Sequence, residues 1–213
     1  MKKVNKILFI SMILLFCIFQ TSCVKVVKTG EEDKLTGKVT FDANTNVSEL
    51  WDTDLLPELL NRAVDLSDLV DNAKGDFANV SDMGLYTMGD TGDLNFTVKD
   101  EATVIENHSD KKAGYLTLSV DSVPSDQVIQ LQVGTLFKGT AIRDNLTSVS
   151  FDDYQNQIEW GGVSHSLNDK VLDTVIDDKI LNLTEGSKIN FTGCFTVSKT
   201  GDIVITPIKI EVL

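Results

Sequence analysis

Apolar and polar residues alternate along several segments in the second half of the chain. The alternation is clearest in residues 115–120, YLTLSV, and in residues 128–133, VIQLQV. A period of two places every second side chain on one face of a β-strand. Together with the polar turns between them, such segments predict strands over residues 94–107, 114–121, 127–134, 188–198 and 202–212.

A helical spacing of apolar residues comes earlier, in residues 46–73. Its apolar positions recur mostly at three- and four-residue steps and are Leu50, Trp51, Leu55, Leu59, Ala63, Leu66 and Val70. This spacing predicts an amphipathic helix. Pro57 lies within the pattern, so we expect a break or kink near Leu56. Residues 76–93, rich in Gly and Asp, are interpreted as a linker.

A second helical pattern runs from about Tyr154 to Leu181, with an interruption expected near Gly161 and Gly162. The two halves of the chain therefore follow the same order of helix, strand, turn and strand, which suggests an internal duplication. The predicted fold class is α+β, with two similar helix-plus-antiparallel-strand lobes that form small barrel-like sheets. We place the lobes at residues 41–135 and 136–213, packed as one globular unit.

The N-terminus reads MKKVNKILFISMILLFCIFQTSC, a basic start followed by an apolar run and small residues before a cysteine. This order is typical of a secretory signal peptide. The apolar run, Ile7 to Phe19, is shorter than the ~20 residues that a membrane-spanning helix needs. We therefore expect residues 1–22 to be removed, Cys23 to be lipidated as in bacterial lipoproteins, and residues 23–40 to form the tether.

One residue departs from the usual lipoprotein signal: Gln20 stands where Leu is common. The alternative interpretation is an ordinary signal peptide that is cut elsewhere and leaves Cys23 as a free thiol. With lipidation, two or three acyl chains hold a protein firmly on a bilayer, whereas one chain binds reversibly. The expected location is then the extracytoplasmic side of a bacterial membrane, periplasmic or at the cell surface.

Charge and cysteine content narrow the function further. The chain has 19 basic and 32 acidic residues, and loss of the three signal-peptide lysines moves the net charge from −13 to −16. Such a surface repels phosphate backbones, so we expect no nucleic-acid partner. Cys194 is the cysteine that remains beside Cys23 in the mature chain, and we interpret it as a small core residue.

Signals for catalysis or metal binding are sparse. Neither His108 nor His165 has another His or Cys at metal-ligand spacing, so no metal and no cofactor are expected. No nucleophile elbow and no phosphate-binding glycine loop are present. We predict a protein without catalytic residues.

The densest group of chemically able residues lies in residues 134–160. The candidates are Lys138, Thr140, Arg143, Asp144, Asn156, Gln157, Glu159 and Trp160. A guanidinium fork, amide groups and an indole face suit a polyhydroxylated or carboxylated ligand. The alternative is structural: Arg143 can pair with Asp144 or Glu159, Asn156 and Gln157 can satisfy a helix start, and Trp160 can be core.

These residues also carry a family resemblance. Gly139 to Asp144 and Phe151 to Trp160, together with Phe41-Asp42, Leu56-Pro57 and Thr206-Pro207, resemble the predicted periplasmic lipoproteins known as domain of unknown function 2291. The resemblance covers about residues 38–211. Tyr154 and Trp160 depart from it, since Phe and Tyr are common there, and the position of Cys194 usually holds a small residue.

The resemblance implies a lipid-anchored extracytoplasmic protein, often encoded beside sugar ABC importers, with no established activity. It transfers no catalytic residue. We therefore expect a non-catalytic binding or accessory protein, anchored in the membrane by its lipid, whose partner is a sugar-binding protein or an ABC transporter. The alternatives are a structural or assembly lipoprotein and a glycan hydrolase, which would need two carboxylates ~5–9.5 Å apart in a cleft.

Overall fold

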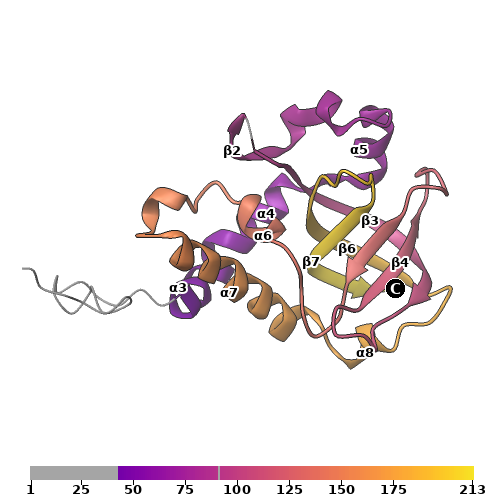
Figure 1. Ribbon diagram of the computed structural model, residues 1–213. Helices are drawn as coiled ribbons and strands as arrows, with labels where there is room; N and C mark the ends of the chain where they lie inside the picture. Colours follow the sequence, from indigo (N-terminus) through magenta and orange to yellow (C-terminus); the bar gives the residue numbers. More distant parts are fainter. Residues whose placement is uncertain (1–42, 91) are drawn as a thin grey trace, which may run out of the picture. The chain divides into compact units, whose positions relative to one another are not determined.

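The computed structural model describes residues 43–90 and 92–213 of the 213-residue chain (Figure 1). The expected signal peptide, residues 1–22, the tether, residues 23–40, and Cys23 lie outside the described residues. None of the helices in the described ranges is both long and apolar enough to cross a membrane.

The first helical segment differs from the predicted single helix with a break at Pro57. It consists of α3 (Ala43–Leu50), the π-helix η1 (Trp51–Leu55) and α4 (Leu56–Arg62). The chain does not break near Leu56, because Pro57 lies in the first turn of α4; the expected irregularity takes the form of a change from π to α winding between Leu55 and Leu56. The Leu56 N–H bonds to the Trp51 carbonyl across the wider π turn.

The helical segment is instead interrupted after Arg62. Ala63 is extended (φ −66°, ψ 118°) and leads into the short strand β1 (Val64–Asp65) and then α5 (Leu66–Ala73). The expected linker also has structure, since it contains the 3-10 helix η2 (Phe77–Met83) and the strand β2 (Leu85–Asp90). The linker interpretation was therefore wrong, and β2 becomes important for the site below.

The five predicted strands are confirmed. They are β3 (Leu94–Asn107), β4 (Tyr115–Val120), β5 (Ile129–Gln132), β6 (Lys188–Thr196) and β7 (Ile203–Val212). Alternating burial in β4, with Leu116, Leu118 and Val120 inside, follows the alternation in the sequence.

The strands of both halves join in one seven-stranded sheet. Antiparallel pairs link β3 to β4, β4 to β5, β7 to β6 and β6 back to β3, while β5 and β7 run parallel. These pairings form a ring that is not a regular barrel, and β1 and β2 add to β3. The α+β class is confirmed, but each half does not form its own sheet, and the internal duplication stays a prediction.

A core cluster of buried apolar side chains is centred on the ring of strands. Within it the rings of Phe96 and Phe195 stack with centroids 5.5 Å apart, and Phe77 contacts both. Gly193 sits at an irregularity of β6, and a Cβ there would lie 2.5 Å from the Ile205 side chain. Cys194 is fully buried beside it, which confirms its interpretation as a core residue.

Further helices follow β5. These are α6 (Ala141–Asp144), the 3-10 helix η3 (Phe151–Asp153), α7 (Gln157–Val175) and α8 (Asp178–Leu181). Helices α3 and α7 run side by side (Figure 1). Trp51, Leu59, Ile142 and Leu167 are buried in this helical part.

Helix α7 continues through Gly161 and Gly162, so the interruption expected there was wrong. The pair costs helix propensity, but Asn156 caps the helix and α3 packs along it, which offsets that cost. The actual end comes at Ile176, which is extended (φ −93°, ψ 113°) before α8 begins.

Candidate functional site

Arg143 and Asp144 form a buried ion pair at the end of α6. The Nη2 atom of Arg143 lies 2.7 Å from Asp144 Oδ1, and Nε donates to the same oxygen over 2.8 Å. Their side chains are 8% and 5% exposed. Thr140 Oγ1 donates to the other carboxylate oxygen over 2.5 Å. Arg143 thus pairs with Asp144, as the structural alternative expected, and Thr140 joins the pair.

The same guanidinium connects α6 to the first turn of α7. Arg143 Nη1 donates to the Trp160 carbonyl over 3.2 Å, and Cζ lies 4.2 Å from the centroid of the indole ring. A planar guanidinium over an aromatic face gains cation–π attraction. Arg143 therefore fixes both the backbone and the ring of Trp160.

An aromatic cluster surrounds that indole. Phe151 approaches it edge-on at 6.1 Å and Tyr154 is tilted at 5.3 Å. Partial burial, and then the nearby Asp153 carboxylate, raise the pKa of Tyr154 above its ordinary value of 10.0. The phenol therefore stays neutral across the physiological range, and the cluster presents aromatic faces with a neutral polar edge.

Other predicted residues serve the helix start. Asn156 Oδ1 accepts from the N–H groups of Ile158 and Glu159 over 2.9 and 3.0 Å. Glu159 Oε2 accepts from the Gln155 N–H over 2.9 Å. Both side chains satisfy backbone donors that would otherwise lack partners at a helix N-terminus. Asn156 thus behaves as the structural alternative expected.

A cleft of about 950 Å³ lies against this assembly. Among the predicted residues, Arg143, Asp144, Gln157 and Trp160 line it. Lys138, Thr140, Asn156 and Glu159 do not belong to its lining, and Lys138 is exposed. The structure thus brings half of the predicted set to one cavity.

The remaining walls come from segments that the sequence did not single out. Leu85, Tyr86 and Thr87 of β2 form one wall, and residues 146–152 other than Ser148 form another. Residues 85–87 fell in the segment interpreted as a linker, and no periodic pattern marks residues 146–152. Both segments lie near Trp160 only in the folded structure. Their spacing in the sequence therefore could not identify either wall.

Glu58 of α4 holds the second wall in place. Its Oε1 accepts from the backbone N–H and the hydroxyl of Thr147, and its Oε2 accepts from both groups of Ser148, at 2.5 to 3.2 Å. Desolvation by burial raises the pKa of Glu58, but these bonds outweigh it and leave the pKa below its ordinary 4.5. A single carboxylate therefore fastens the wall to α4 across about 90 residues of sequence.

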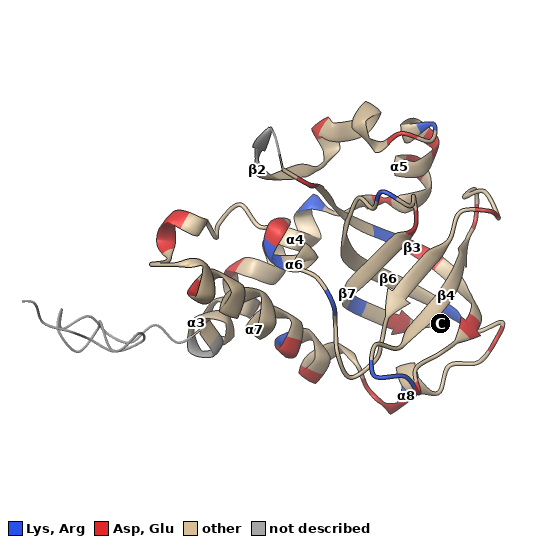
Figure 2. Cartoon of the chain, viewed as in Figure 1, with Lys and Arg blue, Asp and Glu red and all other residues tan. Residues whose placement is uncertain are grey.

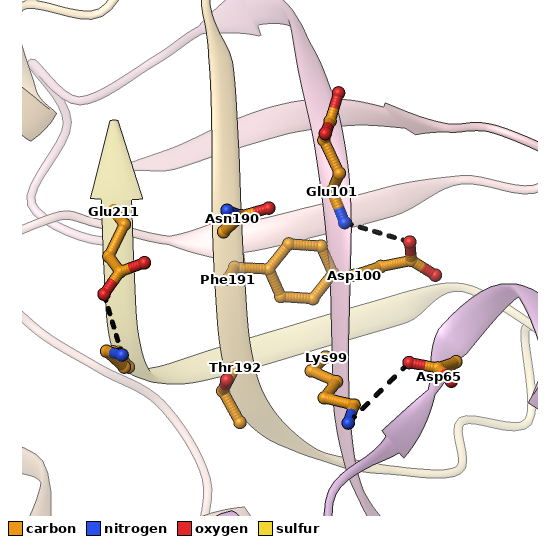
Figure 3. Close-up of a pocket in the computed structure, with 9 residues that line it drawn as sticks. Asp65, Lys99, Asp100, Glu101, Asn190, Phe191, Thr192 and Glu211 are labelled. Atoms are coloured by element: carbon orange, nitrogen blue, oxygen red, sulfur yellow. Dashed lines mark hydrogen bonds and ion pairs between the residues drawn. The ribbon is translucent and has the colours of Figure 1, made fainter. Parts of the chain in front are cut away.

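A smaller cavity of about 300 Å³ lies over β3, β6 and β7 (Figure 3). Its charges pair with one another: Lys99 lies 3.9 Å from Asp65, and Lys209 lies 2.7 Å from Glu211. In the cartoon of Figure 2, stretches coloured for acidic and for basic residues both occur on these strands. Acidic residues outnumber basic ones in this lining, and its ion pairs are exposed, as on a solvated sheet face.

The described residues contain no group of three or more His, Cys, Asp and Glu side chains placed to hold a metal ion. His108 Nε2 lies 3.0 Å from a Glu106 oxygen, and its ring lies 4.9 Å from that of Tyr115. His165 is exposed on α7.

Comparison with known proteins gives a family and a fold. The family model described as "Predicted periplasmic lipoprotein (DUF2291)" matches residues 13–211. A crystal structure of an OB-fold protein from Thermotoga maritima is similar with a TM-score of 0.63 and 17% identity, covering 81% of this chain and 99% of that one. No curated protein matches.

Proposed function

Because the chain belongs to the predicted periplasmic lipoprotein family, we propose that it is a lipid-anchored, non-catalytic binding protein whose cleft takes a small polyhydroxylated ligand. The anchor would be diacylglycerol on Cys23, after removal of residues 1–22. The proposed partner is a sugar uptake system, either its binding protein or its ABC transporter. Family membership supports the envelope location, whereas the ligand and the partner are proposals that go beyond family membership.

The observation that carries the proposal is the position of Trp160. Its indole lines the cleft and is held from one side by Arg143 and from another by Phe151 and Tyr154. A rigid aromatic ring costs little conformational entropy when a ligand stacks on it. The apolar face of a sugar ring suits such stacking.

Polar groups around the ring suit the hydroxyls of a sugar. Gln157 offers an amide donor and acceptor, and Asp152 offers a carboxylate, both in the lining of the cleft. A cleft of about 950 Å³ falls in the range of small-ligand sites. The combination of few polar groups with an aromatic wall is the usual composition of a ligand pocket.

Titration calorimetry of the mature protein in detergent, against a panel of pentoses and hexoses and the cognate sugar-binding protein, tests the proposal. We expect binding that Trp160→Ala abolishes and that Lys138→Ala, outside the cleft, leaves unchanged. Absence of heat across the whole panel would remove the proposed function.

A second candidate, a structural or assembly lipoprotein, is favoured by one observation. A network of polar side chains forms its hydrogen bonds internally and with the Trp160 carbonyl, rather than towards the cleft. Its members are Thr140, Arg143 and Asp144. Under this alternative Trp160→Ala lowers stability and changes no binding event. Measuring both the stability and the sugar binding of Trp160→Ala therefore distinguishes the two candidates.

A further inference from the structure

Large apolar side chains gather, exposed, at the start of α7. Ile158 is 80% exposed and Phe151 is 46% exposed. The ring of Trp160 contacts the rings of both Phe151 and Tyr154. We call Phe151, Tyr154, Ile158 and Trp160 the apolar tip. A clustered apolar surface of this kind marks a site of contact with another apolar body.

The apolar tip lies at the end of the domain where the chain enters from its anchor. Ala43, the first described residue, packs by Gly162, since a Cβ added to Gly162 would lie 3.7 Å from the Ala43 Cβ. Gly162 follows Ile158 by four positions on α7, which is one helical turn. The chain therefore enters the domain one turn from the most exposed residue of the apolar tip.

The distance to the anchor is short in sequence. Cys23 precedes Ala43 by 20 positions. Even fully extended, such a segment reaches about 70 Å, at roughly 3.5 Å per residue. An acylated Cys23 would thus keep the apolar tip at a high effective concentration beside the bilayer.

From this placement we infer that the apolar tip rests on the bilayer that carries the anchor, with Ile158 and Phe151 entering its interfacial region. The inference depends on the proposed lipidation of Cys23. Trp and Tyr suit this depth, because their rings are apolar and their edges polar. A bilayer that carries the anchor would lie near the point where the chain enters the domain. The apolar tip can therefore be covered without any additional partner.

The charges around the apolar tip specify which lipid it fits. Asp152, Asp153 and Glu159 border it, and the carboxylates of Asp153 and Glu159 accept backbone N–H bonds from Ser150 and Gln155. These acidic groups repel anionic headgroups. The apolar tip therefore suits zwitterionic phospholipid, and contact weakens as the fraction of anionic lipid rises.

The test uses the full lipidated protein on zwitterionic vesicles that contain phospholipid brominated on its acyl chains. Because the anchor holds every variant on the vesicle, quenching of Trp160 reports contact of the domain itself. The second tryptophan, Trp51, is 2% exposed and deeply packed, and a Trp160→Phe variant gives its background. Ile158→Asp is compared with Ile105→Asp, which changes an apolar residue 42% exposed on β3.

We expect loss of Trp160 emission in the wild type and in Ile105→Asp, and recovery of emission in Ile158→Asp. Unquenched Trp160 in the wild type, or equal quenching in both variants, would overturn the inference and leave a protein partner or a second copy of the chain as the occupant. Flotation tests lipidation separately from contact of the apolar tip. Protein that does not float with the vesicles lacks the anchor, which refutes lipidation. Failure to bind sugars leaves the quenching result unaffected.

Discussion

The guanidinium carbon of Arg143 lies 4.2 Å from the centroid of the Trp160 ring, and the same side chain binds the Trp160 carbonyl. One arginine thus couples the short helix α6 to the first turn of α7. Its own charge is neutralised by the adjacent Asp144, so the coupling depends on a buried pair.

Loss of that arginine is the first prediction. Arg143→Ala leaves the Asp144 carboxylate buried without its cation, so we expect a loss of about 3–5 kcal/mol in the free energy of unfolding. Chemical denaturation of the wild type, both single variants and the Arg143→Ala/Asp144→Ala double variant measures it. The double variant should recover part of the loss, and a single-variant loss below about 1 kcal/mol would contradict a buried pair.

Glu58 gives a prediction about acid. Its pKa is lower in the folded state, so it stabilises the fold at pH values above 4.5, and this stabilisation disappears as the pH falls through the folded pKa. Since the Glu58 side chain is only partly buried, we expect a stabilisation of about 1 kcal/mol at neutral pH after solvent screening.

Denaturation of Glu58→Gln at neutral pH and at pH values below the folded pKa checks this. The wild type and the variant should differ at neutral pH and converge in acid, whereas Asp173→Asn, an exposed acid on α7, should change little at either. A difference that persists unchanged in acid would show that Glu58 acts by packing rather than by charge.

Two glycines provide opposite outcomes. Gly193→Ala would place a Cβ 2.5 Å from Ile205 Cγ2 and 2.6 Å from the Thr206 carbonyl oxygen, so we expect a destabilisation of roughly 1–3 kcal/mol or more. Gly161→Ala meets nothing within 4 Å inside α7 and should stabilise by about 0.5–1 kcal/mol. Thermal melts of the two variants measure these changes in stability. Equal changes in melting temperature would refute the close approach of β6 and β7.

Cys194 should be chemically inert. Burial, opposed weakly by a hydrogen bond with Thr97 and the charge of Arg62, raises the pKa of its thiol to about 12. The reactive thiolate is therefore scarce at neutral and mildly alkaline pH. Mass spectrometry after alkylation should find Cys194 unmodified in the folded protein and modified in denaturant. Rapid labelling of the native protein would contradict this burial.

Cys23 carries the prediction on anchoring. Native protein purified from a bacterial envelope should show, by intact and peptide mass spectrometry, an N-terminus at Cys23 with a diacylglyceryl thioether. Cys23→Ser should release the protein from membranes, because a serine hydroxyl gives no thioether. An unmodified thiol at this position, or retained residues ahead of it, would refute lipidation.

The sequence predicted the strands well and the helices less well, for physical reasons. Alternation in β4 reflects a face buried within the ring of strands, and a period of two residues identifies such a face directly. Pro57 misled because a π turn precedes it, and Gly161 because packing against α3 outweighs its low propensity. Neither effect is visible in local composition.

The site was predictable only in part. Arg143, Asp144, Gln157 and Trp160 stood out by chemistry and line the cleft. Their neighbours Tyr86 and Thr87 belong to a strand more than 50 residues away, and Glu58 acts from α4 on residues 147 and 148. Long-range proximity of this kind follows from the order of the strands rather than from spacing.

That order also has a consequence for biogenesis. Strand β7 lies between β5 and β6 and runs parallel to β5, so it completes the ring although it follows both in the chain. A polypeptide that emerges N-terminus first cannot close this ring until residues 203–212 are available. Until then β5 and β6 each keep one edge without its partner strand, so the ring closes only when almost the whole chain has been made.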